Sequence, residues 1–158
     1  MIVLGFDPGL DGAIAIYWPD TNKLVVHDTP TMGDKKRRCI NAAQLSHLIQ
    51  QEIKEDMPWV AAFVEDVHAM IGWGIGSAFR FGESKGVLFG VLGALNIPTR
   101  RVAPQTWKKK LGLSRDKDAS RKLAIETWPH HADLFARVKD DNRAEAALIA
   151  KYGWSQLQ

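Results

Sequence analysis

Acidic side chains stand at the ends of two uncharged, apolar segments of this sequence. Asp7 follows the run Met1–Phe6, and Glu65 follows the run Trp59–Val64. Both runs are predicted to be buried strands, because they carry no charge and contain mostly apolar residues. A carboxylate at the end of a buried strand is costly unless water, a hydrogen bond or a cation satisfies it. These two acids are therefore the first candidates for chemistry.

A second pair of acids lies near the other end of the sequence. Asp141 and Glu145 are four residues apart, so they share one face of a helix. The small neighbours Ala144, Ala146 and Ala147 would let that helix sit close to a sheet. Offsetting the helix macrodipole is an alternative role for Asp141, but that role accounts poorly for Glu145.

Together these four acids predict a metal-dependent site. If the two strands are parallel neighbours, Asp7 and Glu65 emerge at the same carboxyl edge, where open α/β sheets place their sites. Converging carboxylates repel one another by a few kcal/mol per pair at an effective dielectric of about 20. Divalent cations relieve this repulsion, and oxygen-only ligands favour Mg²⁺ or Mn²⁺ over zinc. The predicted catalytic and metal-binding residues are Asp7, Glu65, Asp141 and Glu145.

The chemistry expected of such a site is hydrolysis of a phosphodiester. Two hard cations about 4 Å apart can activate water on one side and stabilise a departing 3′ oxygen on the other. They also neutralise a phosphate that the bare acids would repel. For Asp7 alone, capping of the following turn, which contains Pro8 and Gly9, is an alternative that the sequence leaves open.

The elements that must position these acids predict an α/β domain over residues 1–158, with a mixed five-stranded sheet flanked by helices. The expected strands are 1–6, 13–18, 24–28, 59–64 and 99–102, and Thr29–Arg38 is expected to be a polar loop. The expected helices are 41–56, 77–96 and 104–110, one from Ser114 or Asp116 to about Trp128, and one from Asp140 or Asp141 to about Tyr152.

Gly82, Gly86 and Gly90 lie on one face of the second helix, where we expect close packing against a sheet, a helix or a second subunit.

Composition sets broad limits on function. The chain has 158 residues, of which 46% are hydrophobic and 25% charged, as in ordinary soluble proteins. Its single cysteine, Cys39, excludes an internal disulfide and favours a reducing compartment. We expect no signal peptide and no membrane span, because the longest apolar run, 86–97, is far short of about 20 residues. The expected location is the cytoplasm of a bacterium or of a phage-infected host.

Positive charge is unevenly distributed along the chain. The net charge is +3, but Lys35–Arg38 and Lys108–Lys110 form dense clusters, and Lys117, Arg121 and Lys122 follow closely. Basic patches that coexist with isolated acids are expected of a surface that binds phosphodiesters. Solvated loop and helix faces are the simpler alternative for any single cluster.

With these residues identified, the sequence resembles the RuvC family of Holliday junction resolvases, within the ribonuclease H-like superfamily. It is most similar to the small versions found in phages. The matching stretches are Ile2–Gly9, Val64-Glu65, Phe81–Val87 and Asp141–Ala150. Their order and spacing are more specific than any one motif, since actin-like ATPases and sugar kinases share an Asp-x-Gly turn.

The resemblance implies a homodimer that binds four-way DNA junctions and nicks two strands of like polarity. By position, Asp7, Glu65 and Glu145 fall on metal-binding acids of the family, with Asp141 as the fourth. Two departures leave the fourth ligand open: the family often has Asp in place of Glu145, and its partner acid often falls where this chain has Asn142. Asp140 is a further alternative.

The resemblance also implies DNA contacts outside the acids. In the family, a loop after the second acid enters the junction with an apolar or aromatic side chain, and here that loop contains His68, Met70 and Trp73. Trp73 is the predicted wedge, with packing back onto the sheet as its alternative. Family lysines that contact phosphate fall on Lys108 and Lys117. The full predicted DNA-binding set is Trp73, Arg80, Lys85, Lys108, Lys109, Lys117 and Arg121.

Three other functions are weighed against junction resolution. An actin-like nucleotide-binding protein needs a second lobe and phosphate motifs that 158 residues do not provide. A non-catalytic DNA-binding module would not need all four acids. A related nuclease acting on RNA–DNA hybrids or other branched DNA stays open at the level of sequence.

Overall fold

The computed structural model describes residues 1–53, 59–68, 71–113 and 118–158. Its core is a five-stranded sheet in the order β3-β2-β1-β6-β7, in which β1 lies at the centre. The strands pair antiparallel from β1 to β3 and parallel from β1 through β6 to β7. The expected mixed five-stranded sheet flanked by helices is therefore confirmed. The strand bounds are β1 Ile2–Asp7, β2 Ala13–Trp18, β3 Lys23–Asp28, β6 Val60–Glu65 and β7 Thr99–Val102.

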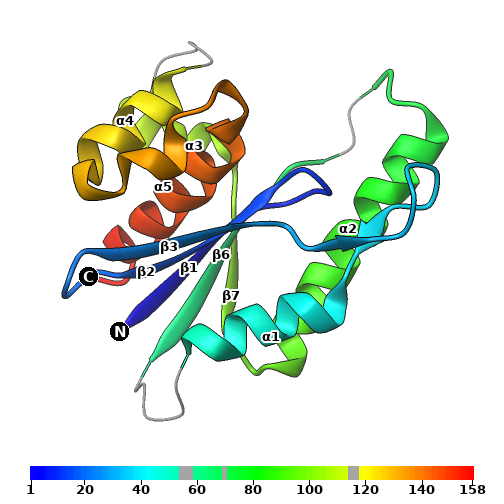
Figure 1. Ribbon diagram of the computed structural model, residues 1–158, viewed down its shortest axis with the longest axis horizontal. Coiled ribbons are helices and arrows are strands. Elements are labelled where there is room, and N and C mark those ends of the chain that lie inside the picture. Colours follow the sequence, from blue (N-terminus) through cyan, green and yellow to red (C-terminus); the bar gives the residue numbers. More distant parts are fainter. Residues whose placement is uncertain (54–58, 69–70, 114–117) are drawn as a thin grey trace.

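Helices cover both faces of this sheet (Figure 1). One face carries α1 (Ala42–Glu52) and α2 (Ile75–Ala94), and the other carries α3 (Pro104–Lys110), α4 (Ala119–Thr127) and α5 (Asp141–Ser155). Two 3₁₀ segments, Pro129–Phe135 and Val138–Asp140, precede α5. Among the described residues, no helix is both long and apolar enough to cross a membrane.

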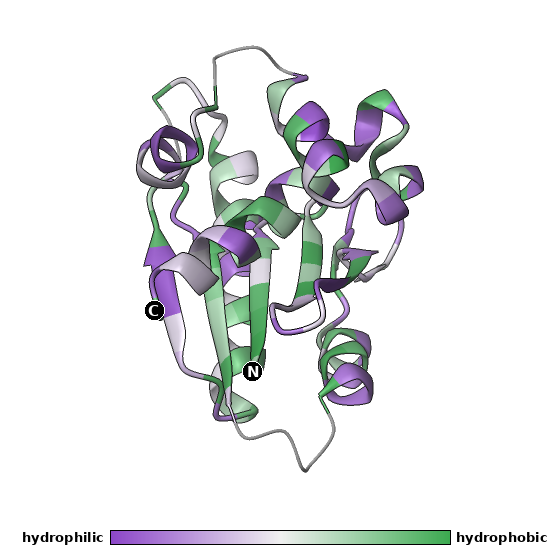
Figure 2. Cartoon of the chain, turned by 90° about the vertical axis from the view of Figure 1, so that its left-hand side faces the viewer, coloured by the Kyte–Doolittle hydropathy of each residue, from purple (hydrophilic) through white to green (hydrophobic). Residues whose placement is uncertain are grey.

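Alternation along the strands divides the core into two layers. On β1, Val3 packs on the α5 side, whereas Ile2, Leu4 and Phe6 pack on the side of α1 and α2. The central strands are apolar almost throughout (Figure 2), as expected for strands buried on both faces. Since side chains alternate with period two, Gly5 and Asp7 belong to the same face as Val3. The acid that ends β1 is thus directed to the α5 side of the sheet.

Several element boundaries differ from the sequence predictions. Helix α1 begins as predicted, with the Asn41 side chain accepting a hydrogen bond from the Gln44 N–H at 3.1 Å, but it ends at Glu52. The predicted end near Asp56 and the predicted caps Ser114 and Asp116 lie outside the described residues. Helix α2 starts at Ile75, two residues earlier than predicted, because the extended Gly74 can serve as its N-cap.

The segment predicted to be a polar loop, Thr29–Arg38, forms most of a small hairpin that ends at Ile40. β4 (Thr31–Met32) pairs antiparallel with β5 (Cys39–Ile40), and Ile40 is buried against the α1–α2 layer. Strands of two residues are too short for a period-two pattern, so the sequence offered no signal for them.

Glycine at position 5 allows α5 to lie directly on β1. A Cβ atom placed there would stand 2.1 Å from the carbonyl oxygen of Ala146 and 2.5 Å from the backbone nitrogen of Ala150. Backbone therefore meets backbone at this crossing, and no larger residue fits without displacing the helix. Because α5 also carries the second pair of acids, this contact sets their distance from the sheet.

We predict that Gly5→Ala destabilises the fold by about 3 kcal/mol, within the range of overpacked cores. For a chain of this size that corresponds to a fall in Tm of roughly 6–12 °C, measured by circular dichroism. Gly76→Ala in α2 is the matched control, since a Cβ there meets nothing within 4 Å among the described residues. A Gly5→Ala protein as stable as the control would contradict the close approach.

Candidate active site

The predicted acids of β1 and β6 end neighbouring strands at one edge of the sheet. The parallel register pairs Phe6 with Val64, so the next residues along each strand are Asp7 and Glu65. Glu65 is buried, with 5% of its surface exposed, and it faces the α5 side by the same alternation as Asp7. The expectation that these two acids emerge together is confirmed by this register.

The acids of α5 join them electrostatically. Burial raises the pKa of Asp7 well above its ordinary value of 3.8, and the charges of Glu65, Glu145 and Asp141 raise it further. The Lys108 ammonium acts in the opposite sense. The three other predicted acids therefore all act on Asp7, from β6 and α5, which are far from β1 in the sequence.

Glu65 has a hydrogen-bond partner that the sequence analysis missed. The fully buried Trp107, on α3, donates from its indole Nε1 to Glu65 Oε1 at 2.9 Å. Burial raises the pKa of Glu65, this hydrogen bond lowers it, and the charge of Glu145 raises it again, with a net increase. The indole can thus fix the orientation of the carboxylate while leaving its second oxygen available.

Glu145 is held by two partners, one on α3 and one on α4. Lys108 Nζ lies 2.7 Å from Glu145 Oε1, and Ser120 Oγ donates to the same oxygen at 3.1 Å. The ion pair is partly exposed, and such pairs contribute only about 0–1 kcal/mol. A stronger ligand for either partner, a divalent cation for Glu145 or a phosphate for Lys108, can therefore displace it.

The three residues that the sequence left open as the fourth acid have different surroundings. Asp140 is buried, and although burial alone would raise its pKa, hydrogen bonds from the Arg137 side chain and backbone hold that pKa below its ordinary value. Asn142 donates through Nδ2 to the carbonyl of Asp11 at 2.6 Å. The charge of Asp141, by contrast, raises the pKa of Asp7. Asp140 serves as the partner of an arginine.

The donor chemistry of the site fits a hard divalent cation. All four acids supply oxygen, and the pKa values of Asp7 and Glu65 are raised first by burial and then by neighbouring carboxylates, so a bound cation would stabilise their charged forms. Within the described part of the chain, however, no three His, Cys, Asp or Glu side chains are close enough to hold one ion as they stand. Binding of a cation would therefore require these side chains to rearrange, including release of Glu145 from Lys108.

The predicted DNA-binding cations have varied surroundings. Lys108 lies within the acidic site, and Lys109 and Arg80 are exposed. Lys85 is mostly buried and donates to Asp66 Oδ1 and to the Val67 carbonyl, at 3.2 and 2.8 Å. Arg121 donates to the carbonyls of Phe135 and Ala136 and to Asp118. Lys117 and Met70 lie outside the described residues.

The predicted wedge, Trp73, packs on a helix and not on the sheet. Its ring meets Phe81 of α2 edge-to-face, with centroids 5.4 Å apart, and 37% of its surface stays exposed. Together with Gly9, Leu10, Ser77, Arg80 and Ser84, these rings line a hollow of about 210 Å³ beside the turn that follows Asp7. Nearby Ile71 is fully exposed and Ile75 almost so, and the sequence analysis did not single out either as a wedge.

The glycine face of α2 is open. Its buried residues are Ser84, Leu88 and Leu92, and a Cβ placed on Gly82, Gly86 or Gly90 would meet nothing within 4 Å among the described residues. Among the described residues, this face therefore packs against neither a sheet nor a helix, the first two of the three neighbours expected for it. A second subunit is the one expected neighbour that the structure leaves possible.

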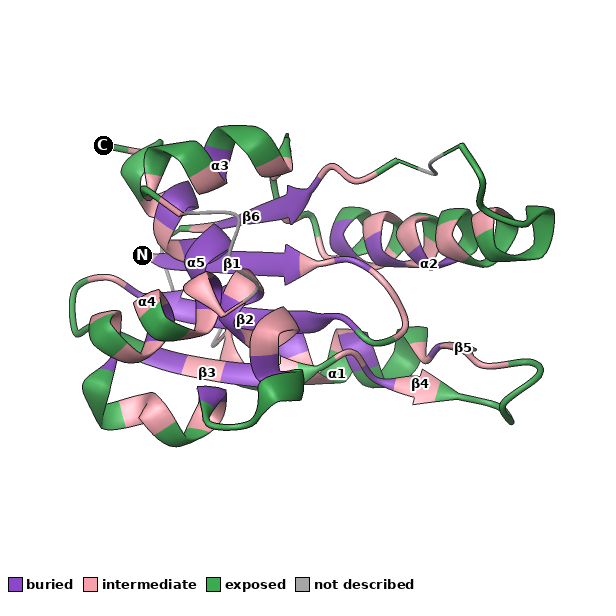
Figure 3. Cartoon of the chain, turned by 90° about the horizontal axis from the view of Figure 1, so that it is seen from above, coloured by how far each residue is buried: buried purple, intermediate pink, exposed green. Residues whose placement is uncertain are grey.

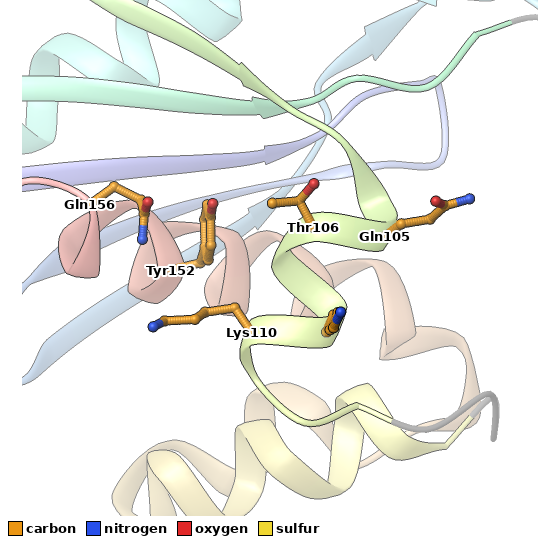
Figure 4. Close-up of a pocket in the computed structure, with 6 residues that line it drawn as sticks. Gln105, Thr106, Lys110, Tyr152 and Gln156 are labelled. Carbon is orange, nitrogen blue, oxygen red and sulfur yellow. The ribbon is translucent and has the colours of Figure 1, made fainter.

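A larger hollow, of about 700 Å³, lies between α3 and the second half of α5 (Figure 4). It is lined by Gln105, Thr106, Lys109, Lys110, Tyr152 and Gln156. None of the four acids contributes to it, so its size does not make it the reactive site.

We predict that Asp7→Asn stabilises the metal-free protein at neutral pH. Because the pKa of Asp7 is raised on folding, the folded chain binds more protons than the unfolded chain between pH 3.8 and the higher folded value. Stability therefore falls as the pH rises through that window, and the full cost persists above it. Asparagine cannot ionise, so the variant avoids this cost.

Thermal unfolding in a chelator would measure the effect. We expect the Tm of Asp7→Asn to exceed that of the wild type by a few degrees at pH 7, with the difference shrinking as the pH falls through this window towards 3.8 and absent below it. An equal or lower Tm for the variant at pH 7 would contradict the described charge balance.

Comparison with known proteins gives a clear result only at the level of structure. No family model matches this chain, and no curated protein matches its sequence. Among solved structures, Thermus thermophilus RuvC in complex with a Holliday junction substrate superposes with a TM-score of 0.64 at 14% identity, over 99% of this chain and 96% of that one.

Two further structures agree. Another Thermus thermophilus RuvC structure gives a TM-score of 0.62 at 14% identity, covering 99% of this chain and 96% of that one. The fowlpox virus Holliday junction resolvase gives 0.58 at 15% identity, covering 99% of both chains. At such low identity the similarity establishes architecture, and this chain has the ribonuclease H-like fold of the RuvC-type resolvases.

Proposed function

We propose that this chain is a metal-dependent endonuclease that resolves four-way DNA junctions by paired nicks in strands of like polarity. The observation that carries the proposal is the convergence of acids from β1, β6 and α5 on Asp7, beside the ammonium of Lys108. The fold shared with a RuvC that was solved with a Holliday junction substrate supports the same substrate class. The reducing compartment expected from one cysteine is consistent with action in the cytoplasm of a bacterium or a phage-infected host.

The proposed ligands for Mg²⁺, two ions per site, are Asp7, Glu65, Asp141 and Glu145, and Mn²⁺ would serve as well. When bound, such ions supply an activated water and neutralise charge on the scissile phosphate. The chain contributes the positions of the oxygens. Trp107 orients Glu65, and Ser120 orients Glu145 after Lys108 has released it.

Lys108 has a second proposed role once it leaves Glu145. Its ammonium is a flexible point charge within the site, and such a group can donate to a phosphate oxygen of the bound strand. Glu145 would thus exchange its ammonium partner for metal, and Lys108 would exchange its carboxylate partner for DNA. After both exchanges, each group still has a partner of opposite charge.

The remaining DNA contacts are proposed around this centre. Arg80 and Lys109 are exposed and free to approach phosphates, whereas Lys85 and Arg121 must first leave their partners in the protein. Trp73 is the proposed wedge, since stacking on an unpaired base contributes about 1–3 kcal/mol. Ile71, fully exposed on the same loop, is a second candidate.

The proposed enzyme acts as a homodimer, since two paired nicks need two active sites. The open face of α2 fits such an interface, because its glycines would let a second backbone approach closely. Ile75 and Phe79 continue this face at helical spacing, and both are mostly exposed. A second copy of α2 would cover these apolar side chains.

A cleavage assay tests the proposed activity. Purified protein would be incubated with Mg²⁺ and either a synthetic four-way junction, a linear duplex or an RNA–DNA hybrid, and products resolved on denaturing gels. We expect symmetric nicks in two strands of the junction and at least tenfold slower cleavage of the other substrates. Asp7→Asn should retain junction binding and lose cleavage by a factor of about 10³ or more.

The controls separate the alternatives. Preferential cleavage of the hybrid would replace junction resolution with a ribonuclease H activity. Junction binding by the wild type without nicking in Mg²⁺ or Mn²⁺ would favour a non-catalytic module. Cleavage by Asp7→Asn at the wild-type rate would refute the assignment of the site.

The dimer is tested by Gly86→Glu. A side chain there has open space in the monomer, and replacing a helical glycine should favour the helix, so the fold should be preserved. We expect the wild type to sediment as a dimer and the variant as a monomer with unchanged helical content. A monomeric wild type, or a variant that dimerises as tightly, would contradict an interface on this face.

A further inference from the structure

The hairpin formed by β4 and β5 presents three consecutive cations that the proposed site does not use. Lys35, Lys36 and Arg37 occupy its connecting turn, and all three are exposed. The one acid of this turn, Asp34, is engaged by the backbone. Its Oδ1 accepts hydrogen bonds from the N–H groups of Lys36 and Arg37, at 2.8 and 3.0 Å.

These hydrogen bonds give the turn a defined shape. The Arg37 N–H also donates to the Asp34 carbonyl at 3.1 Å, which closes a tight turn. Gly33 enters the turn with φ of +89°, and a Cβ there would meet the Arg37 carbonyl at 2.4 Å. The three cations therefore project from an ordered backbone, which lowers the entropy lost when they bind an anionic partner.

The fourth basic residue, Arg38, ties the hairpin to the turn that follows Asp7. Its Nη1 lies 2.6 Å from Asp11 Oδ1, its Nη2 donates to the Leu10 carbonyl at 2.6 Å, and its Nε donates to Thr31 Oγ1 at 3.1 Å. On the other side, Ile40 is buried with Leu88 and Leu92 of α2. The hairpin is thus fixed between α2 and the turn at the acidic site.

The hairpin extends beyond the same edge of the sheet at which Asp7 and Glu65 end their strands. Figure 3 shows β4, β5 and α2 reaching past the carboxyl ends of β1 and β6. A hollow of about 360 Å³ lies at the base of the hairpin, lined by Leu10, Asp11, Gly12, Arg38, Asp141 and Asn142, among others. Its lining joins the hairpin to the first turn of α5, which carries one of the four acids.

We propose that this hairpin is a phosphate-binding arm that holds duplex DNA next to the acidic site, through Lys35, Lys36 and Arg37. The inference rests on the proposed function for its substrate, branched DNA. Three adjacent cations without a free acid among them match the regular negative charge of a phosphate backbone. Contacts of this kind position the duplex and do not read its sequence.

The arm is tested with the double variant Lys35→Gln/Lys36→Gln. Dissociation constants for a four-way junction and for a linear duplex would be measured by fluorescence anisotropy at several salt concentrations. Each lost phosphate contact lowers the slope of log K against log salt by about 0.9, so we expect a decrease of nearly two on both DNAs. Affinity at moderate salt should fall roughly tenfold, and ethylation interference should lose a local group of phosphates.

The matched control is Lys23→Glu, which changes the net charge by the same two units. Lys23 is exposed at the start of β3, paired with Trp18, at the end of the sheet opposite the acids. We expect the control to keep the wild-type salt slope and interference pattern. Neither variant should change the Tm by more than a few degrees. Lys35 and Lys36 are exposed, and Lys23 gives up only a cation–π contact with Trp18, at 4.2 Å from the ring centroid, that contributes about 0.5–1 kcal/mol.

The outcomes separate this inference from the proposed function. A variant with the wild-type slope and interference pattern, in a protein that cleaves junctions, would overturn the arm and leave the function intact. A reduced slope in a protein that binds junctions but never cleaves them would support the arm and overturn the nuclease. An equal decrease of the salt slope in the Lys23→Glu control would overturn the arm as a specific contact. A wild type that binds neither the junction nor the linear duplex would overturn both the arm and the proposed function.

Discussion

The contact on which the rest of this structure depends is the crossing of α5 over β1 at Gly5. No side chain separates the two backbones there, since a Cβ would lie 2.1 Å from the Ala146 carbonyl. Glu145 immediately precedes Ala146, and Asp141 lies one turn earlier, so the same crossing determines how near both acids come to Asp7. The small residues of α5 and the glycine of β1 are thus part of the site, although none of them carries a reactive group.

That geometry gathers negative charge that the protein balances only in part. The raised pKa values of Asp7 and Glu65 mark an arrangement that costs folding stability, as is common where function requires like charges to meet. Trp107 and Ser120 offset some of this cost with hydrogen bonds, and Lys108 supplies the nearby positive charge. Each of these partners is neutral or displaceable, so the acids stay available for a stronger cation.

Outside this centre, the molecule divides its surface between two kinds of contact. One face of α2 combines glycines with the exposed side chains of Ile75 and Phe79, which suits an apolar neighbour. The hairpin beside it carries three consecutive exposed cations at its tip, which suits an anionic neighbour. Both extend from the edge that holds the acids, so a single bound partner molecule could reach hairpin and acids together (Figure 3).

Much of this could be predicted from the sequence because it depends on local periodicity. Two uncharged apolar runs that each end in an acid were enough to predict Asp7 and Glu65 at one edge of a sheet if the strands are parallel neighbours. A four-residue spacing was enough to place Asp141 and Glu145 on one helical face. Other features depend on which surfaces meet, and no local pattern records that. The Trp107–Glu65 hydrogen bond joins residues 42 apart, and the direction of the α2 glycine face follows from what packs on its opposite side. The Arg137–Asp140 pair is local, since the two residues are only three apart. The approach of Asp141 to Asp7, in contrast, joins the two ends of the chain and was decided only by tertiary structure, because neighbouring carboxylates of the same type differ in the groups that folding brings to them.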